Sequence, residues 1–69
     1  MKEIIRTNDL ILISRIESIF NQETIYYELF DTNASVIEGS ISAIEKRILV
    51  LEKDFSRSQK LINILTKDN

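Results

Sequence analysis

Glu38, Gly39 and Ser40, followed by Arg47, are the residues whose types and spacing could bind an anion. Successive backbone amides beside a glycine can converge on a negatively charged group. Gly39, the only glycine of the chain, would equally serve a turn that requires positive φ, and we favour that interpretation. Arg47 could contact a phosphate or carboxylate, but such a residue is more often a solvated strand end or a partner of a nearby carboxylate, here Asp31 or Glu38.

Metal and acid–base chemistry have little support. The chain contains no histidine and no cysteine, so the usual ligands of zinc, copper and haem are missing. Asp9, Asp31 and Glu38 could gather around Mg²⁺, yet scattered carboxylates are a weak signal for such a site. No nucleophile stands beside a base. We therefore predict a protein that is not an enzyme and that has no metal or other cofactor.

Three aromatic residues, Tyr26, Tyr27 and Phe30, could stack on bases as in RNA-binding sheets. The net charge of −2 argues against this, because nucleic-acid binding domains are usually basic. Packing in a core or an interface is the favoured role, and no nucleic-acid partner is predicted.

The longest apolar run, Leu10–Ile13, is too short to cross a membrane and is followed by Ser14 and Arg15. No signal peptide is recognisable. These features predict a cytoplasmic protein without a membrane partner.

The elements that must position these residues follow from hydrophobic periodicity. Apolar positions recur at helical spacing in two segments, and runs rich in branched and aromatic residues mark three strands. Val36, Ile37 and Ile41 are interleaved with turn residues in a connection that should lie against the body of the protein. The expected elements of a single domain, residues 1–69, are a strand at 2–7, a helix at 9–22, a strand at 25–31, a loop at 32–45, a strand at 46–51 and a helix at 52–66.

This order, β-α-β-β-α, predicts an α+β fold. A strand–helix–strand crossover makes the first two strands parallel, and the third strand fits between them in antiparallel orientation. The result is a truncated ferredoxin-like α/β plait with strand order 1-3-2 and both helices on one face.

Both faces of this sheet contain apolar side chains. Two helices can cover only one face, so either the loop 32–45 or another molecule should cover the second, and a homodimer is one form of the latter. The residues expected on one face are Tyr27, Leu29, Ile48 and Val50, and those on the other are Tyr26, Glu28, Phe30, Leu49 and Leu51.

Four short segments of the chain occur in a recognisable order and spacing: Arg6-Thr7-Asn8-Asp9, Ser35-Val36-Ile37-Glu38-Gly39-Ser40-Ile41, Lys46-Arg47 and Glu52-Lys53-Asp54-Phe55. Together they resemble a small bacterial family called putative prokaryotic signal-transducing protein. The resemblance covers almost the whole chain and implies an α/β plait related in shape to PII-type nitrogen regulators, in a cytoplasmic bacterial protein. It implies no established biochemistry.

This chain departs from the family pattern at its turns. Where relatives have Ala-Gly-Ile-Pro before the second strand, this chain has Glu23-Thr24-Ile25-Tyr26, and Leu51 stands where they have a proline. Ile44-Glu45-Lys46-Arg47 replaces their Leu-Pro-Arg-Arg. We expect softer turns and a small loss of stability. The chain has no clear nucleotide-binding match, so ATP or 2-oxoglutarate binding is not carried over from PII regulators.

We expect a non-enzymatic binding or regulatory module that contacts a protein partner through residues 32–44 and the adjacent sheet face. Val36, Ile37, Ile41 and Arg47 would make the contact through apolar burial. An alternative is a sensor of an anionic metabolite, held by Glu38, Gly39, Ser40 and Arg47. A third possibility is an accessory subunit of a larger assembly, without a ligand.

Overall fold

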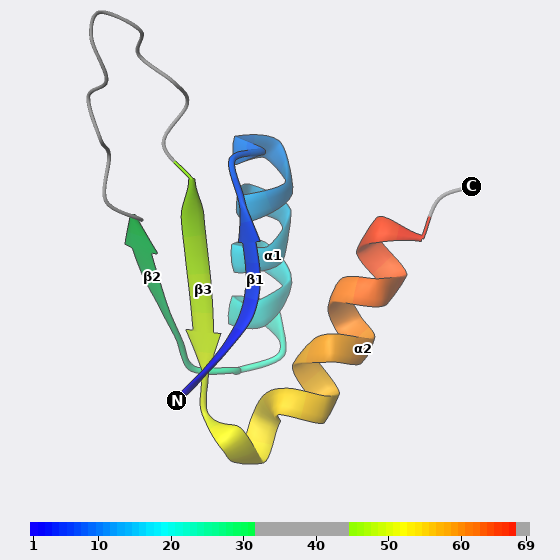
Figure 1. The fold of residues 1–69 in the computed structure, drawn as a ribbon. Coiled ribbons are helices and arrows are strands. Elements are labelled where there is room, and N and C mark those ends of the chain that lie inside the picture. Colours follow the sequence, from blue (N-terminus) through cyan, green and yellow to red (C-terminus); the bar gives the residue numbers. More distant parts are fainter. Residues whose placement is uncertain (32–44, 68–69) are drawn as a thin grey trace, which may run out of the picture.

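Three strands form one sheet in which the last strand of the sequence lies in the middle (Figure 1). The computed structural model describes residues 1–31 and 45–67. Strand β3 (Lys46–Val50) pairs in antiparallel orientation with β1 (Lys2–Thr7) and with β2 (Tyr27–Asp31). The strand order β1-β3-β2 confirms the predicted topology, and β1 and β2 run parallel because both oppose β3.

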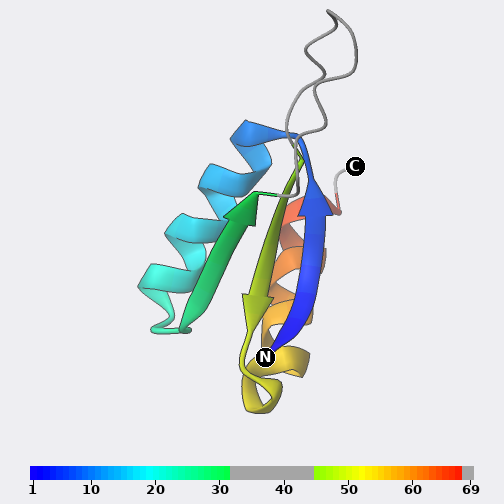
Figure 2. The same cartoon turned by 60° about the vertical axis from the view of Figure 1, so that its left-hand side comes forward.

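Helices α1 (Leu10–Gln22) and α2 (Phe55–Thr66) lie on the same side of this sheet, as Figure 2 shows with the strands in front of them. A short 3₁₀ turn, η1 (Glu52–Asp54), connects β3 to α2. This arrangement confirms the predicted α+β fold with two helices on one face.

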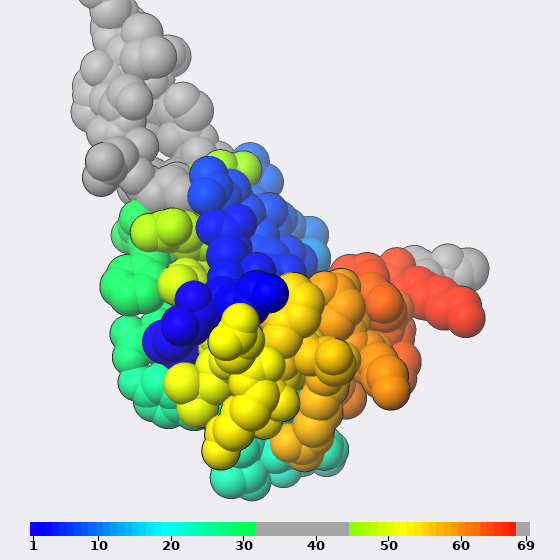
Figure 3. All heavy atoms as spheres, turned by 60° about the horizontal axis from the view of Figure 1, so that its bottom comes forward, coloured from blue at the N-terminus to red at the C-terminus, as the bar shows by residue number. Residues whose placement is uncertain are grey.

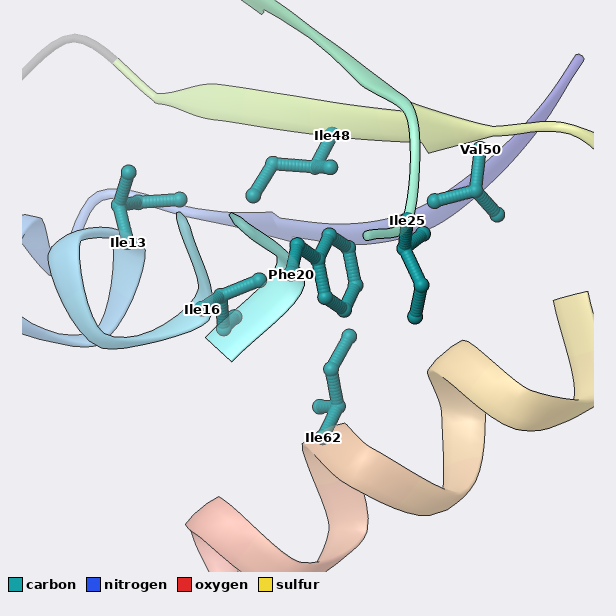
Figure 4. Packing of buried hydrophobic residues seen from close by; sticks show 7 residues of the cluster. All are labelled: Ile13, Ile16, Phe20, Ile25, Ile48, Val50 and Ile62. Atoms are coloured by element: carbon teal, nitrogen blue, oxygen red, sulfur yellow. The ribbon is translucent and has the colours of Figure 1, made fainter. Parts of the chain in front are cut away.

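The core lies between the sheet and the two helices. Phe20 of α1 is fully buried at its centre, with Ile48 and Val50 reaching it from β3 and Ile62 from α2 (Figure 4). Both predicted helical stripes face this core. The buried apolar residues are Ile13, Ile16, Phe20, Ile25, Ile48, Val50 and Ile62.

Helix α1 begins with a side-chain cap. The Asp9 carboxylate accepts hydrogen bonds from the backbone N–H groups of Ile11 (3.0 Å) and Leu12 (3.1 Å). Asp9 is therefore the N-cap residue of α1. The Thr7 hydroxyl accepts a hydrogen bond from the Asp9 N–H (3.1 Å) and so holds the cap residue itself. These bonds satisfy amides that have no partner within the helix.

The end of α1 is a Schellman motif. The Ile25 N–H donates to the Phe20 carbonyl (2.8 Å) and the Thr24 N–H donates to the Asn21 carbonyl (3.3 Å). These two hydrogen bonds define the Schellman cap. Thr24 takes the left-handed conformation, with φ 58°. A β-branched residue is strained there, and glycine is the usual occupant. Thr24 also stands where the resembled family has glycine.

Arg57 ties α2 to this turn. Its guanidinium donates to the Glu23 carbonyl (2.9 Å) and to the Glu23 carboxylate (3.0 Å). The turn is therefore held against α2 by these two hydrogen bonds.

Some element boundaries differ from those expected. Ile25 and Tyr26 precede β2, since the Ile25 N–H completes the helix cap; β2 starts at Tyr27. Leu51 follows β3, and the carboxylates of Glu52 and Asp54 belong to the 3₁₀ turn before α2. The predicted loop 32–45 lies outside the described residues except for Glu45.

Candidate interaction surface

The strands present a second face, away from the helices, which we call the outer face. Side chains directly opposite each other on paired strands share a face. Leu49 of β3 lies opposite Glu3 and Glu28, and its neighbour Arg47 lies opposite Arg6 and Phe30. Tyr26 joins them just before β2. The outer face comprises Glu3, Arg6, Tyr26, Glu28, Phe30, Arg47 and Leu49.

Aromatic and aliphatic side chains on the outer face are accessible to solvent. Tyr26 is 55% exposed and Phe30 41% exposed, and Leu49 is partly buried. The Tyr26 hydroxyl donates a hydrogen bond to the Glu28 carboxylate. This bond, together with the nearby negative charge, raises the pKa of Tyr26, so the phenol stays protonated and acts as a donor.

Opposite charges alternate around these side chains. The Glu3 carboxylate lies 2.9 Å from the Arg6 guanidinium and 3.7 Å from that of Arg47. The hydrogen bond from Arg6 is the main reason why the pKa of Glu3 is lowered, and the same contact raises the pKa of Arg6. With Glu28 included, two carboxylates and two guanidinium groups balance, so the outer face has no strong net charge.

Arg47 is the one described member of the site predicted from the sequence. Its guanidinium stacks over the Phe30 ring, 5.7 Å from the centroid, while its Nε is buried and has no hydrogen-bond partner among the described residues. The expected pairing with Asp31 is wrong. Asp31 lies opposite Lys46, on the other face of the sheet from Arg47, and bonds to the Lys46 ammonium at 2.6 Å. The alternation of side chains along β3 separates these partners.

The structure divides the three aromatic residues. Tyr27 turns inward, with its ring 5.7 Å from that of Phe20 and its hydroxyl 3.2 Å from the Glu17 carboxylate. Burial raises the pKa of Tyr27, and the Glu17 charge adds to the shift. Tyr26 and Phe30 remain on the outer face. This outcome supports the predicted split of the strand between core and surface.

The other candidate site residues divide in two. The predicted members Val36, Ile37, Glu38, Gly39, Ser40 and Ile41 lie outside the described residues. Asp9 caps a helix, and residues 1–31 and 45–67 contain no group of three acidic or other ligating side chains that could hold a metal ion.

Sequence reasoning missed two parts of this surface. Glu3 and Arg6 were not assigned to a face, because the consecutive Ile4 and Ile5 obscure the alternation. A β-bulge between Glu3 and Ile5 accounts for this pattern, since it adds one residue to β1.

Helix α1 also exposes apolar side chains at its first turn. The adjacent residues Leu10 and Ile11 are both exposed. Both lie at the first turn of α1, near the end of the sheet where β2 finishes and β3 begins (Figure 1). The core side of α1 is defined by the buried residues Ile13, Ile16 and Phe20, and Leu10 and Ile11 lie outside it.

No helix among the described residues is long and apolar enough to span a bilayer.

Comparisons with known proteins give a family and no closer relative. No curated protein and no solved structure matches the chain. The related shape expected for PII-type regulators thus stays a prediction. A family model described as "Putative prokaryotic signal transducing protein" matches residues 1–66. Because this match spans nearly all 69 residues, the chain belongs to that prokaryotic family.

Proposed function

We propose that this protein is a non-enzymatic regulatory module that acts by protein–protein contact. The contact surface is the outer face together with residues 32–44, which join β2 to β3. The observation that carries the proposal is the apolar and aromatic surface that Tyr26, Phe30 and Leu49 form on the side of the sheet away from both helices.

The composition of the outer face supports a protein partner. Tyrosine, phenylalanine and arginine are enriched in protein interfaces, while solvent-facing sides of antiparallel sheets are usually polar. Arg47 adds a donor at Nε that has no partner within residues 1–31 and 45–67. Because an unsatisfied buried donor is costly, a small rotation toward an acceptor on a partner would be favourable.

Other functions have weaker support. The balanced charges of the outer face lack the basic excess that phosphate backbones require. The absence of histidine and cysteine from the sequence leaves only Asp, Glu, Lys and Tyr for proton transfer. A cytoplasmic location in a bacterium suits such a module and forms part of the proposal.

Affinity purification from the native cell, with quantitative comparison of variants, tests the proposal. Leu49→Ser should remove most of the signal of a specific partner, because it opens the centre of the outer face. Ile64→Ser is the matched control, since Ile64 is an exposed apolar residue of α2, away from that face. Equal partner recovery with both variants, at unchanged circular dichroism, would refute the use of the outer face.

A thermal-shift screen separates this proposal from a metabolite sensor. A ligand at about 100 times its Kd stabilises a domain by about 2.7 kcal/mol, which raises the Tm of a chain of this size by roughly 10 °C or more. We expect nucleotides and organic acids to leave the Tm unchanged. A reproducible shift, lost in Arg47→Ala, would favour the sensor.

A further inference from the structure

The two edges of the sheet differ in how they are protected. Strands β1 and β2 occupy the edges because β3 lies between them. An edge strand presents unpaired backbone N–H and C=O groups, which another strand can extend unless the edge is blocked. The devices that block such pairing are bulges, charges, prolines and covering elements.

The β1 edge has two of these devices. Its pairing with β3 is interrupted by the bulge between Glu3 and Ile5. The start of α2 also lies against β1: the Lys2 ammonium is 4.8 Å from the centre of the Phe55 ring, and Figure 3 shows the blue strand in contact with the yellow segment that leads into α2.

Within Tyr27–Asp31 the β2 edge has no bulge and no proline, and its only charged side chains are the carboxylates of Glu28 and Asp31. Its five residues pair with β3 in unbroken register and include no proline and no lysine. Leu29 is 37% exposed and its neighbour Phe30 is also exposed. Figure 3 places the green strand at the opposite margin of the molecule from α2.

We propose that two copies of this chain pair through β2 in antiparallel orientation, with Leu29 opposite its counterpart in the second copy. The two three-stranded sheets would then form one continuous six-stranded sheet. This interface goes beyond the partner contact proposed above and does not depend on it.

The side chains of β2 select this register. In the continuous sheet, residues opposite each other on the two β2 strands must lie on the same face. The two-fold axis must therefore place one residue of β2 opposite the same residue of the second copy. An axis at Glu28 brings two carboxylates together, which is unfavourable. An axis at Phe30 places Leu29 opposite Asp31.

The axis at Leu29 keeps like carboxylates apart and pairs Leu29 with an apolar side chain, while Tyr27 faces Asp31 and Glu28 faces Phe30. On the helix side of the sheet, Leu29 then lies opposite Leu29 of the second copy. The buried Ile48 of β3 flanks Leu29 on the other side in each copy. On the outer face, Glu28 lies opposite Phe30, and the Arg47 guanidinium covers that Phe30 ring. Adjacent strands are about 4.8 Å apart, so Arg47 and Glu28 of the second copy lie about two strand spacings apart on either side of Phe30, with opposite charges.

Sedimentation equilibrium of the purified full chain, with a charge-swap pair of variants, tests the inference. The wild type should approach twice the chain mass of 8.0 kDa as concentration rises from micromolar to about millimolar. Phe30→Glu places two like-charged pairs across the interface and should raise the dissociation constant about tenfold or more. Glu28→Lys/Phe30→Glu should recover dimerisation, because lysine then faces glutamate in the Leu29 register.

Ile64→Glu is the matched control, since it adds the same charge to an exposed apolar position on α2 and should leave dimerisation unchanged. Circular dichroism verifies that each variant is folded. The inference is overturned if the wild type stays monomeric at about 1 mM, if Phe30→Glu dimerises as tightly as the wild type, or if the double variant fails to recover. Only the purified chain is present, so these results do not bear on partner capture, which is tested at Leu49.

Discussion

The inner and outer faces of the sheet are made by alternate residues of the same strands, yet they differ in every physical respect. Ile48 and Val50 are fully buried, whereas Arg47 and Leu49, which alternate with them, lie on the side of the sheet without helices. The inner face meets both helices and contributes stability. The outer face contributes little to folding, so aromatic residues placed there are available for other contacts. The core face and the proposed recognition face are thus separated by one residue along β3.

Replacing phenylalanine by alanine on each side should give the largest difference in stability between the core and the outer face. Phe20→Ala should destabilise by about 3–5 kcal/mol, because the ring fills the centre of the core. That loss is comparable with the whole stability of a small domain, so the variant should be largely unfolded at 25 °C. Phe30→Ala should cost about 1 kcal/mol or less. Urea denaturation followed by circular dichroism measures both, and similar losses would contradict the proposed division.

Thr24→Gly should increase the stability of the fold without changing a residue of either sheet face. Relief of the left-handed strain at φ 58° should stabilise by about 1 kcal/mol and raise the Tm by roughly 4–8 °C. Thr24→Ala is the control, because alanine keeps the Cβ that causes the strain. If alanine stabilises as much as glycine, strain at this position is not the cause.

Ser58→Ala tests whether the core tolerates the buried hydroxyl that α2 contributes to it. Ser58 is fully buried on α2, and its hydroxyl has no hydrogen-bond partner in the part of the chain that the structure describes. Removing an unsatisfied hydroxyl should be neutral or should stabilise by up to about 1 kcal/mol. Calorimetry measures the change in Tm, and Ser56→Ala, on the exposed side of the same helix, gives the reference. A large loss would show that the hydroxyl is bonded in solution.

The smallest expected effect is a pH dependence on the outer face. Because the pKa of Glu3 is lowered below its usual 4.5 in the folded protein, the carboxylate contributes stability above that value and loses it as the pH falls through the folded pKa. Stability should therefore decline from about pH 5 toward pH 3, and Glu3→Gln should reduce that slope. Urea midpoints across this range, with Glu17→Gln as a control, measure the difference. An unchanged slope would mean that the exposed pair is screened by solvent.

Local patterns in the sequence were sufficient for the element order, both helical stripes and the division of β2 and β3 between two faces. The spacing of Ile13, Ile16 and Phe20 and the alternation around Ile48 depend only on helix and strand geometry. The assignment of Arg47 to Asp31 failed because charge and proximity in sequence do not reveal a face. The bulge in β1 was missed for a related reason: two adjacent isoleucines fit either a buried strand or an extra residue.

The sequence by itself determined the β-α-β-β-α order, the α+β class and the apolar faces of both helices, because these depend on periodicities of 3.6 and 2 residues along one segment. The tertiary structure decided which charges meet on the outer face, which edge strand carries a bulge and which turn residue is strained. Those features arise between segments far apart in the chain. Glu3 meets Arg47, and Arg57 holds Glu23, only after β1, β3 and both helices have packed around Phe20.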